Sequence, residues 1–156
     1  MVALSPDSQR LIKLLDQKKR LLAMVAPSFP VDFKKKGLIG ALKKLGFDKV
    51  CDHAVSIAMV NKMYEDLFEK EKGGIVIAAN CPATVNLIKT RFPNLAKYLP
   101  DIPAPIGVNG KLCKEWWPRN LNIFIGPCIA KKQEIKSYPE DFMLLSLIIV
   151  MKKISL

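Results

Sequence analysis

The sequence is poor in the patterns by which metal sites and membrane spans are usually recognised. It has one histidine in 156 residues, and no two of its cysteines are spaced as the Cys-x-x-Cys half of a zinc knuckle. Its longest apolar run, Phe142 to Met151, is shorter than the roughly 20 residues that span a bilayer. A zinc knuckle and a membrane partner are therefore not expected. The lone histidine, His53, falls in the first turn of a predicted helix, where we expect a surface or capping residue.

Acidic residues are also scarce relative to basic ones. Lys and Arg number 25 and Asp and Glu number 14, which gives a formal net charge of +11. Such an excess favours anionic partners in general. Aromatic residues are not interleaved with the lysines, however, and the lysines follow helix-surface spacing. We therefore expect a solvated lysine-rich surface, and a nucleic-acid partner is not indicated.

No secretory signal is recognisable in the first ten residues, which are mostly polar and lead into a charged amphipathic stretch. The four cysteines are Cys51, Cys81, Cys113 and Cys128, and we expect them to be free thiols. Free thiols persist in reducing compartments. These features together predict a cytoplasmic location.

Half of the residues are hydrophobic and a quarter are charged, which suits one domain with an ordinary core. Apolar runs typical of buried strands alternate with amphipathic stretches typical of helices. The expected strands are residues 21–26, 47–51, 75–79, 121–125 and 144–150, and the expected helices are residues 6–19, 34–45, 53–70, 82–92, 106–116 and 130–137. This alternation predicts an α/β fold, with a mainly parallel sheet of about four to five strands flanked by helices.

One stretch, Gly73 to Arg91, places a cysteine between a predicted buried strand and a predicted helix. The apolar run ends at Asn80-Cys81-Pro82, and proline suits the first position of a helix because its missing N–H has no intrahelical partner there. Unpaired N–H groups and the helix macrodipole favour a thiolate at such a place. Cys81 is thus a candidate metal ligand or nucleophile. The alternative is that it is a small buried hydrophobic residue, as free cysteines often are.

Three predicted strands end in similar sequences that combine a proline with a cysteine or serine. They are Ala26-Pro27-Ser28, Asn80-Cys81-Pro82 and Gly126-Pro127-Cys128. In open parallel sheets, ligands bind beyond the carboxyl ends of the strands. A parallel sheet would therefore bring Cys81 and Cys128 within reach of each other, with Lys131 and Lys132 adding positive charge beside them.

These strand ends resemble the catalytic domain of iron-only (di-iron) hydrogenases, which is the C-terminal domain of the large chain, over about Leu22 to Tyr138. The family's first cluster motif has a strand followed by Thr-Ser-Cys-Cys-Pro, and residues 78–82, Ala-Ala-Asn-Cys-Pro, match it. Its second motif is Met-Pro-Cys-x-x-Lys-x-x-Glu, and residues 126–134 match it with Pro127, Cys128, Lys131 and Glu134. The second motif is the more specific of the two. The resemblance implies one lobe of the hydrogenase H-cluster domain.

The resemblance also implies a cofactor and roles for particular residues. The family's H-cluster is a 4Fe-4S cube that a cysteine joins to a di-iron unit. Cys81 and Cys128 would be two of the four thiolate ligands of the cube. Lys131 would hydrogen-bond to a cyanide ligand and Glu134 would belong to the proton path, while the turn at Ala26-Pro27-Ser28 would pack against the di-iron unit. The alternative for Lys131 and Glu134 is an exposed i, i+3 pair of little energetic consequence.

Three positions of the family's proton path differ in this chain. The cysteine that precedes the first ligand is replaced by Asn80, whose amide does not titrate. A serine on the same route falls at Pro100, and a second serine, beside the cyanide ligands of the cofactor, falls at Ala104. Neither residue has a hydroxyl. A proton path needs groups that accept and release protons. The chain is therefore closest to the variants without the shuttle cysteine, which are proposed to sense H2, and we expect weak, sensory or absent turnover.

The Cys-x-x-x-Cys motif that supplies the family's other two ligands is absent, so the ligand set is incomplete. We expect a second lobe or subunit to supply further cysteines, and an external donor such as ferredoxin to supply electrons. The sequence stops resembling the family after Phe142. The predicted division is an N-terminal helix at residues 1–20, a hydrogenase-like lobe at residues 21–142, and an atypical, truncated or substitute C-terminal strand or tail at residues 143–156.

Two other functions remain open from the residues alone. A cofactor-free basic α/β module would use its lysine-rich face to bind an acidic protein or a nucleic acid, with a strong dependence on salt. A cysteine nucleophile at Cys81 is the second. The sequence after Cys81 does not form a phosphate-binding Cys-x5-Arg loop, because Leu87 occupies the position of the arginine.

Overall fold

The computed structural model describes residues 5–29, 35–71, 74–138 and 145–148. Within these ranges a four-stranded sheet has the order β2-β1-β3-β4, and every neighbouring pair of strands is parallel. The strands are β1 (Leu21–Val25), β2 (Lys49–Asp52), β3 (Leu121–Gly126) and β4 (Leu145–Ile148). The predicted α/β fold with a mainly parallel sheet is confirmed.

Helices cover both faces of the sheet. Alternate residues of the two central strands are therefore buried on opposite sides. On one face, Leu21, Ala23 and Val25 of β1 pack against α1 (Pro6–Asp16) and α3 (Lys35–Leu45). On the other, Leu22 and Met24 pack against α6 (Pro105–Trp116). All five residues of β1 are buried, which explains why this strand is an unbroken apolar run rather than an alternating one.

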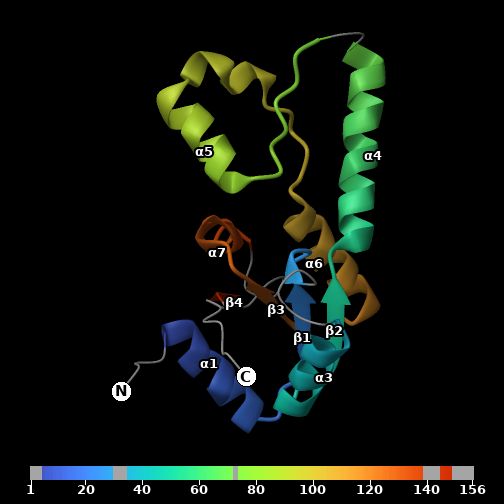
Figure 1. Ribbon diagram of the computed structural model, residues 1–156, viewed down its shortest axis with the longest axis vertical. Coiled ribbons are helices and arrows are strands. Elements are labelled where there is room, and N and C mark those ends of the chain that lie inside the picture. The colour runs from blue at the N-terminus through green and yellow to red at the C-terminus, as the bar shows by residue number, and fades with distance from the viewer. Residues whose placement is uncertain (1–4, 30–34, 72–73, 139–144, 149–156) are drawn as a thin grey trace.

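The remaining helices lie toward the carboxyl end of the sheet (Figure 1). The long helix α4 (Ala54–Glu71) begins just after β2 and packs against α6 through Val60, Tyr64 and Val108. Beyond the sheet lie α5 (Pro82–Arg91) and the 3₁₀ helix η1 (Pro93–Tyr98), and the short α7 (Ile129–Ile135) follows β3 and contacts α5.

Capping residues in the sequence mark the ends of two helices. The Ser5 side chain accepts a hydrogen bond from the Ser8 N–H at the start of α1, with Pro6 in the first turn. Gly46 follows α3 with φ of 113°, the left-handed conformation that glycine adopts without steric cost. The apolar residues Ile12, Leu45 and Phe68 would be expected on the inner faces of their helices, but the structure leaves all three exposed.

The predicted strand at residues 75–79 is wrong. This segment is extended but pairs with no strand of the described sheet. Ile75 is 68% exposed, and the segment is held by the Ile77 N–H, which donates to the Tyr98 carbonyl at 2.8 Å, and the Ala79 N–H, which donates to the Tyr64 hydroxyl at 2.7 Å. Cys81 therefore does not follow a strand of the sheet, and its position depends on the packing of α4, α5 and η1.

The strand order creates a crevice between β1 and β3. The chain leaves β1 toward β2 on one side and returns to β3 on the other side of β1. At such a topological switch point the connections diverge and leave room for a ligand beyond the carboxyl ends of the strands. Here those ends are Ala26-Pro27-Ser28 and Gly126-Pro127-Cys128.

Candidate functional site

A cavity of about 290 Å³ lies at this switch point. Its wall is mostly apolar and combines the ends of β1 and β3 with the first residues of α5, α6 and α7. It is lined by Ala26, Pro27, Ser28, His53, Ile57, Asn80, Cys81, Pro82, Pro105, Ile106, Phe124, Pro127, Cys128 and Lys131. Most residues of the candidate site therefore come together, although they are far apart in the sequence.

Cys81 occupies the N-cap of α5 with an exposed side chain. The backbone N–H and the hydroxyl of Thr84 lower the pKa of the Cys81 thiol, and the Ala83 N–H and the Lys131 ammonium act in the same direction. This is the environment predicted for a thiolate at a helix start. The alternative of a buried hydrophobic cysteine at this position is wrong.

Cys128 occupies the N-cap of α7 and is also exposed. Close packing at Gly126 brings the ends of β1 and β3 together just before it. A Cβ added at Gly126 would lie 2.7 Å from the Phe124 ring and 3.0 Å from Ala26 Cβ. Glycine is thus the residue that permits this approach, and the chain then turns through Pro127 into the cavity wall.

Lys131 connects the two cysteine-bearing segments. Its ammonium donates to the Asn80 carbonyl at 3.1 Å and pairs with the Glu134 carboxylate at 2.7 Å. The two paired side chains are only 19% and 13% exposed, so the alternative of an exposed surface pair is wrong. A partly buried, hydrogen-bonded ion pair holds its geometry better than a solvated one.

Glu134 also acts on Tyr138, the last residue of this part of the described chain. Burial, followed by the Glu134 carboxylate, raises the pKa of Tyr138 to about 12. The phenol reaches across α6 at Gly107, where an added Cβ would lie 2.5 Å from the Tyr138 oxygen. Neither Tyr138 nor Gly107 carries a local sequence signal of this packing.

His53 is buried, so the prediction of a surface or capping residue is wrong. It is 3% exposed, its ring meets Phe124 edge-on, and its Nδ1 lies 3.1 Å from the Val25 carbonyl oxygen. The Asn109 side-chain nitrogen lies 3.4 Å from the same Nδ1, and the closer Val25 oxygen, which can only accept, favours the tautomer with the proton on Nδ1. Desolvation lowers the pKa of His53 to about 4. A lone histidine in a first turn gave no local signal of this burial.

Two polar atoms near the cavity wall are buried without a hydrogen-bond partner. They are Nε2 of His53 and Oδ1 of Asn80, and both residues line the cavity. Buried polar groups are nearly always hydrogen-bonded, and leaving one unpaired costs free energy. Two such atoms in residues that line one cavity indicate a site that a bound group completes.

Ala104 lies outside this cavity, at the N-cap of α6. It lines a neighbouring cavity of about 440 Å³ together with Pro100, Glu134, Ala79 and Pro82. Ala104 was expected beside the group bound by Cys81 and Cys128, but it does not line the cavity that contains these two cysteines. Glu134 and the two positions without hydroxyls, Pro100 and Ala104, all line this neighbouring cavity.

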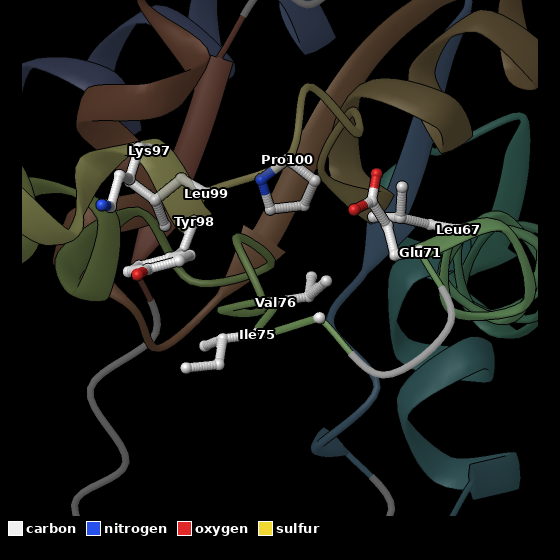
Figure 2. Close-up of a pocket in the computed structure, with 9 residues that line it drawn as sticks. Leu67, Glu71, Ile75, Val76, Lys97, Tyr98, Leu99 and Pro100 are labelled. Carbon is white, nitrogen blue, oxygen red and sulfur yellow. The ribbon is translucent and has the colours of Figure 1, made fainter.

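A third cavity, of about 390 Å³, adjoins the extended segment on its other side. Figure 2 shows Pro100 between the Glu71 carboxylate and the Lys97 side chain, with Ile75 and Val76 opposite. None of its lining residues is a cysteine or histidine. It lacks the ligand chemistry of the cavity at the switch point.

The other two cysteines, Cys51 and Cys113, do not line any of the three cavities. Cys113 is fully buried, as expected for a packing residue, and lies against Cys51, whose proximity raises the pKa of the Cys113 thiol. Among the described residues, no three His, Cys, Asp or Glu side chains form a group that could hold a metal ion.

A model of the family "Iron only hydrogenase large subunit, C-terminal domain" matches residues 19–143. The chain belongs to this iron-only hydrogenase family. The large subunit of the periplasmic [Fe] hydrogenase of Nitratidesulfovibrio vulgaris is 28% identical over 147 residues, which cover 78% of this chain and 35% of that protein. The predicted family is thereby confirmed.

Solved [FeFe]-hydrogenases share the fold of this hydrogenase domain. An apo variant of HydA1 from Chlamydomonas reinhardtii aligns with a TM-score of 0.65 and 17% identity, covering 90% of this chain and 44% of that one. A second HydA1 variant from the same organism also has a TM-score of 0.65, with 19% identity and coverage of 83% and 39%. The hydrogenase domain described here thus spans less than half the length of the relatives it matches.

Within the described ranges of this hydrogenase domain, no helix is both 18 residues or longer and apolar enough to cross a membrane.

Proposed function

We propose that this chain is an iron–sulfur domain of the H-cluster type, in which Cys81 and Cys128 bind iron. The observation that carries the proposal is that both thiols, each at the N-cap of a helix, line one cavity at the topological switch point of the sheet. Thiolates are the ligands of iron–sulfur clusters. A bound cluster of this kind supplies one-electron transfer.

The residues around the cavity fit such a group in part. The lowered pKa of Cys81 favours the ligating thiolate, and the Lys131 ammonium offsets the negative charge of thiolates and cluster. The unpaired oxygen of Asn80 lies in the same wall. Cys51 and Cys113 are not in this wall, so two of the four thiolates of a 4Fe-4S cube must come from elsewhere.

We infer that a second lobe or subunit supplies the missing ligands, because the sequence spans only 35–44% of the relatives named above. Electrons would come from an external donor such as ferredoxin. All four cysteines are free thiols, which suits the proposed cytoplasmic location.

We infer that turnover of H2 is weak, sensory or absent. The amide of Asn80 does not titrate, and Pro100 and Ala104 line the adjoining cavity without hydroxyls. The Glu134 carboxylate is already paired with the Lys131 ammonium. A chain of groups that pass protons in both directions is therefore interrupted along this wall.

The proposal is tested by loading the full chain with iron and sulfide under anaerobic conditions, then measuring bound iron and the EPR spectrum of the reduced form. The wild type should bind iron, and Cys81→Ser and Cys128→Ser should each lose most of it. Cys51→Ser is the matched control, because it removes a thiol outside the cavity and keeps a donor to the Asp52 carbonyl. A wild type that stays free of iron, even with a second lobe added, contradicts the proposal.

A further inference from the structure

The two cysteines outside the cavity at the switch point, Cys51 and Cys113, lie on the same side of the sheet. Cys51 of β2 is the register partner of Met24 of β1, and residues in register on neighbouring strands point to the same face. That face is the one covered by α6, where Met24 and Cys113 belong to one buried cluster and Cys51 packs against it. The strand pairing therefore turns Cys51 toward the helix that carries Cys113.

Contacts with α6 bring the two sulfur atoms together. The Cys51 Sγ lies 3.9 Å from the Asn109 Oδ1, and Asn109 stands one helical turn before Cys113, so both residues lie on the same face of α6. The Cys113 thiol itself forms a hydrogen bond with the Cys51 sulfur. The two thiols are thus direct neighbours, although they are far apart in the sequence.

The two thiols differ in exposure and in acidity. Cys51 is half-buried, whereas Cys113 is fully buried. The hydrogen bond from Cys113 lowers the pKa of Cys51, and the same contact, together with burial, raises the pKa of Cys113. The thiolate is the reactive form of cysteine. A reachable thiol of lowered pKa beside a protected, protonated one is the arrangement of a nucleophilic and a resolving cysteine.

We propose that Cys51 and Cys113 form a redox-active dithiol, which hydrogen peroxide oxidises to an internal disulfide. The Cys51 thiolate attacks one oxygen of the peroxide, the O–O bond breaks, and Cys51 becomes a sulfenic acid while hydroxide takes up a proton and leaves as water. The Cys113 sulfur then attacks the Cys51 sulfur and gives up its proton, the S–O bond breaks, and a second water leaves. Two electrons pass from the two sulfurs to the peroxide.

The burial of the pair selects a small oxidant. Cys51 is only half-buried, but Cys113 has no exposed surface, so a bulky disulfide reaches the pair less readily than a peroxide does. Neither cysteine lines the cavity at the switch point. The inference is therefore independent of the proposed iron site.

Asn109 connects the pair to the wall of that cavity. Its Oδ1 faces the Cys51 Sγ, its Nδ2 lies 3.4 Å from the His53 Nδ1, and His53 lines the cavity. A disulfide with Cys113 removes the S–H of Cys51 that faces Asn109. Oxidation of the pair should therefore change the surroundings of the His53 ring.

The test treats the metal-free full chain with a small excess of hydrogen peroxide near neutral pH, blocks the remaining thiols and maps the peptides by mass spectrometry without reduction. We expect one pair of peptides joined through Cys51 and Cys113, which dithiothreitol separates. The inference is overturned if Cys51 and Cys113 both stay free, if Cys51 joins another cysteine instead, or if Cys51 stops at the sulfinic acid.

Variants separate the roles of the two thiols. In Cys113→Ala the sulfenic acid of Cys51 has no resolving partner, so its labelling by dimedone should rise several-fold over wild type. Equal labelling in wild type and Cys113→Ala would show that Cys113 does not resolve it. Cys128→Ser is the matched control, because it removes an exposed thiol at another place and should leave the Cys51–Cys113 linkage unchanged.

The single histidine of the sequence reports on the cavity wall. With ¹⁵N-histidine in the chain, peroxide should shift the NMR signals of the His53 ring, and dithiothreitol should restore them. The shift should be absent in Cys113→Ala. Unchanged His53 signals in a chain that carries the disulfide overturn the connection through Asn109. Circular dichroism shows whether Cys113→Ala is folded, and the peptide map of the wild type decides the result if it is not.

Discussion

His53 shows how much a residue's chemistry depends on its surroundings. The imidazole lies between the end of β1 and the Phe124 ring, and only 3% of it is exposed. Protonation there means placing a charge in an apolar environment with the Lys131 ammonium nearby. The ring is therefore neutral at pH 7.

The burial of His53 predicts a pH dependence of the metal-free protein. The unfolded histidine has a pKa of 6.5 and the folded one about 4, so between these values the unfolded state binds more protons. The contribution of His53 to stability is thus fully present above pH 6.5 and is lost as the pH falls toward 4. The loss should amount to about 3 kcal/mol.

Urea unfolding of wild type and His53→Asn at a series of pH values checks this prediction. The variant removes the titrating group, so the difference between the two free energies of unfolding isolates His53 from the carboxylates. A difference that stays constant from pH 7 to pH 4 would contradict the burial.

At the scale of elements, the thiols of Cys81 and Cys128 both lie at the N-termini of helices. α5 begins after Cys81 with Pro82 in its first turn, and α7 begins after Cys128. At the start of α5, the N–H groups of Thr84 and Ala83 lower the pKa of the Cys81 thiol. The ion pair between Asp7 and Lys132 also joins α1 to α7, which helps to hold α7 at the edge of the sheet.

The environment of Cys81 predicts the effect of Thr84→Val. The substitution removes the hydroxyl but leaves the backbone N–H, so the pKa of Cys81 should rise and remain below that of an ordinary thiol. Alkylation near neutral pH should then be slower, because the thiolate is the reactive species. The measurement is the rate of iodoacetamide labelling of Cys81 as a function of pH, resolved by peptide mass spectrometry.

Thr90→Val is the control for that experiment, because Thr90 lies in the same helix and its hydroxyl donates to the Asn86 carbonyl at 2.7 Å instead. Thr90→Val should leave the labelling curve of Cys81 unchanged. Equal curves for Thr84→Val and wild type would show that the hydroxyl does not act on the thiol.

At the scale of the whole molecule, the cavity exists because elements outside the sheet reach its carboxyl end. β1 and β3 supply one side of the wall, whereas Asn80 and Cys81 arrive from the extended segment beyond the sheet (Figure 1). That segment is held by Tyr98 and Tyr64 rather than by strand pairing. Cys81 is therefore attached less rigidly than Cys128, which follows β3 directly.

Hydrogen exchange should reveal this difference. Within the described residues the amides of Ile75, Val76 and Ala78 donate no hydrogen bond, so they should exchange much faster than the buried amides of β1. Ala79, bonded to the Tyr64 hydroxyl, should be more protected. NMR-detected exchange of the metal-free protein tests this.

Tyr64→Phe, which keeps the ring, should remove the protection of Ala79 and leave β1 unchanged. Slow exchange throughout residues 75–79 would instead mean that the segment pairs as a strand.

Much of this protein follows from the sequence alone. Capping residues, apolar periodicity and proline positions are local signals, and they placed α1, α3, α5 and α6 and the cysteines at helix starts close to where they lie. The Pro-Cys-x-x-Lys-x-x-Glu pattern at Pro127–Glu134 was enough to indicate the family, now supported by the match over residues 19–143.

Only the tertiary structure decided the course of residues 75–79 and the burial of His53. An apolar run has the same local sequence whether it joins a sheet or lies against helices, because pairing depends on which strands have a free edge. The environment of His53 likewise comes from Val25, Phe124 and Asn109, which lie far from it in the chain. Local chemistry therefore determined where the helices start and where the thiols sit, and long-range packing determined what surrounds them.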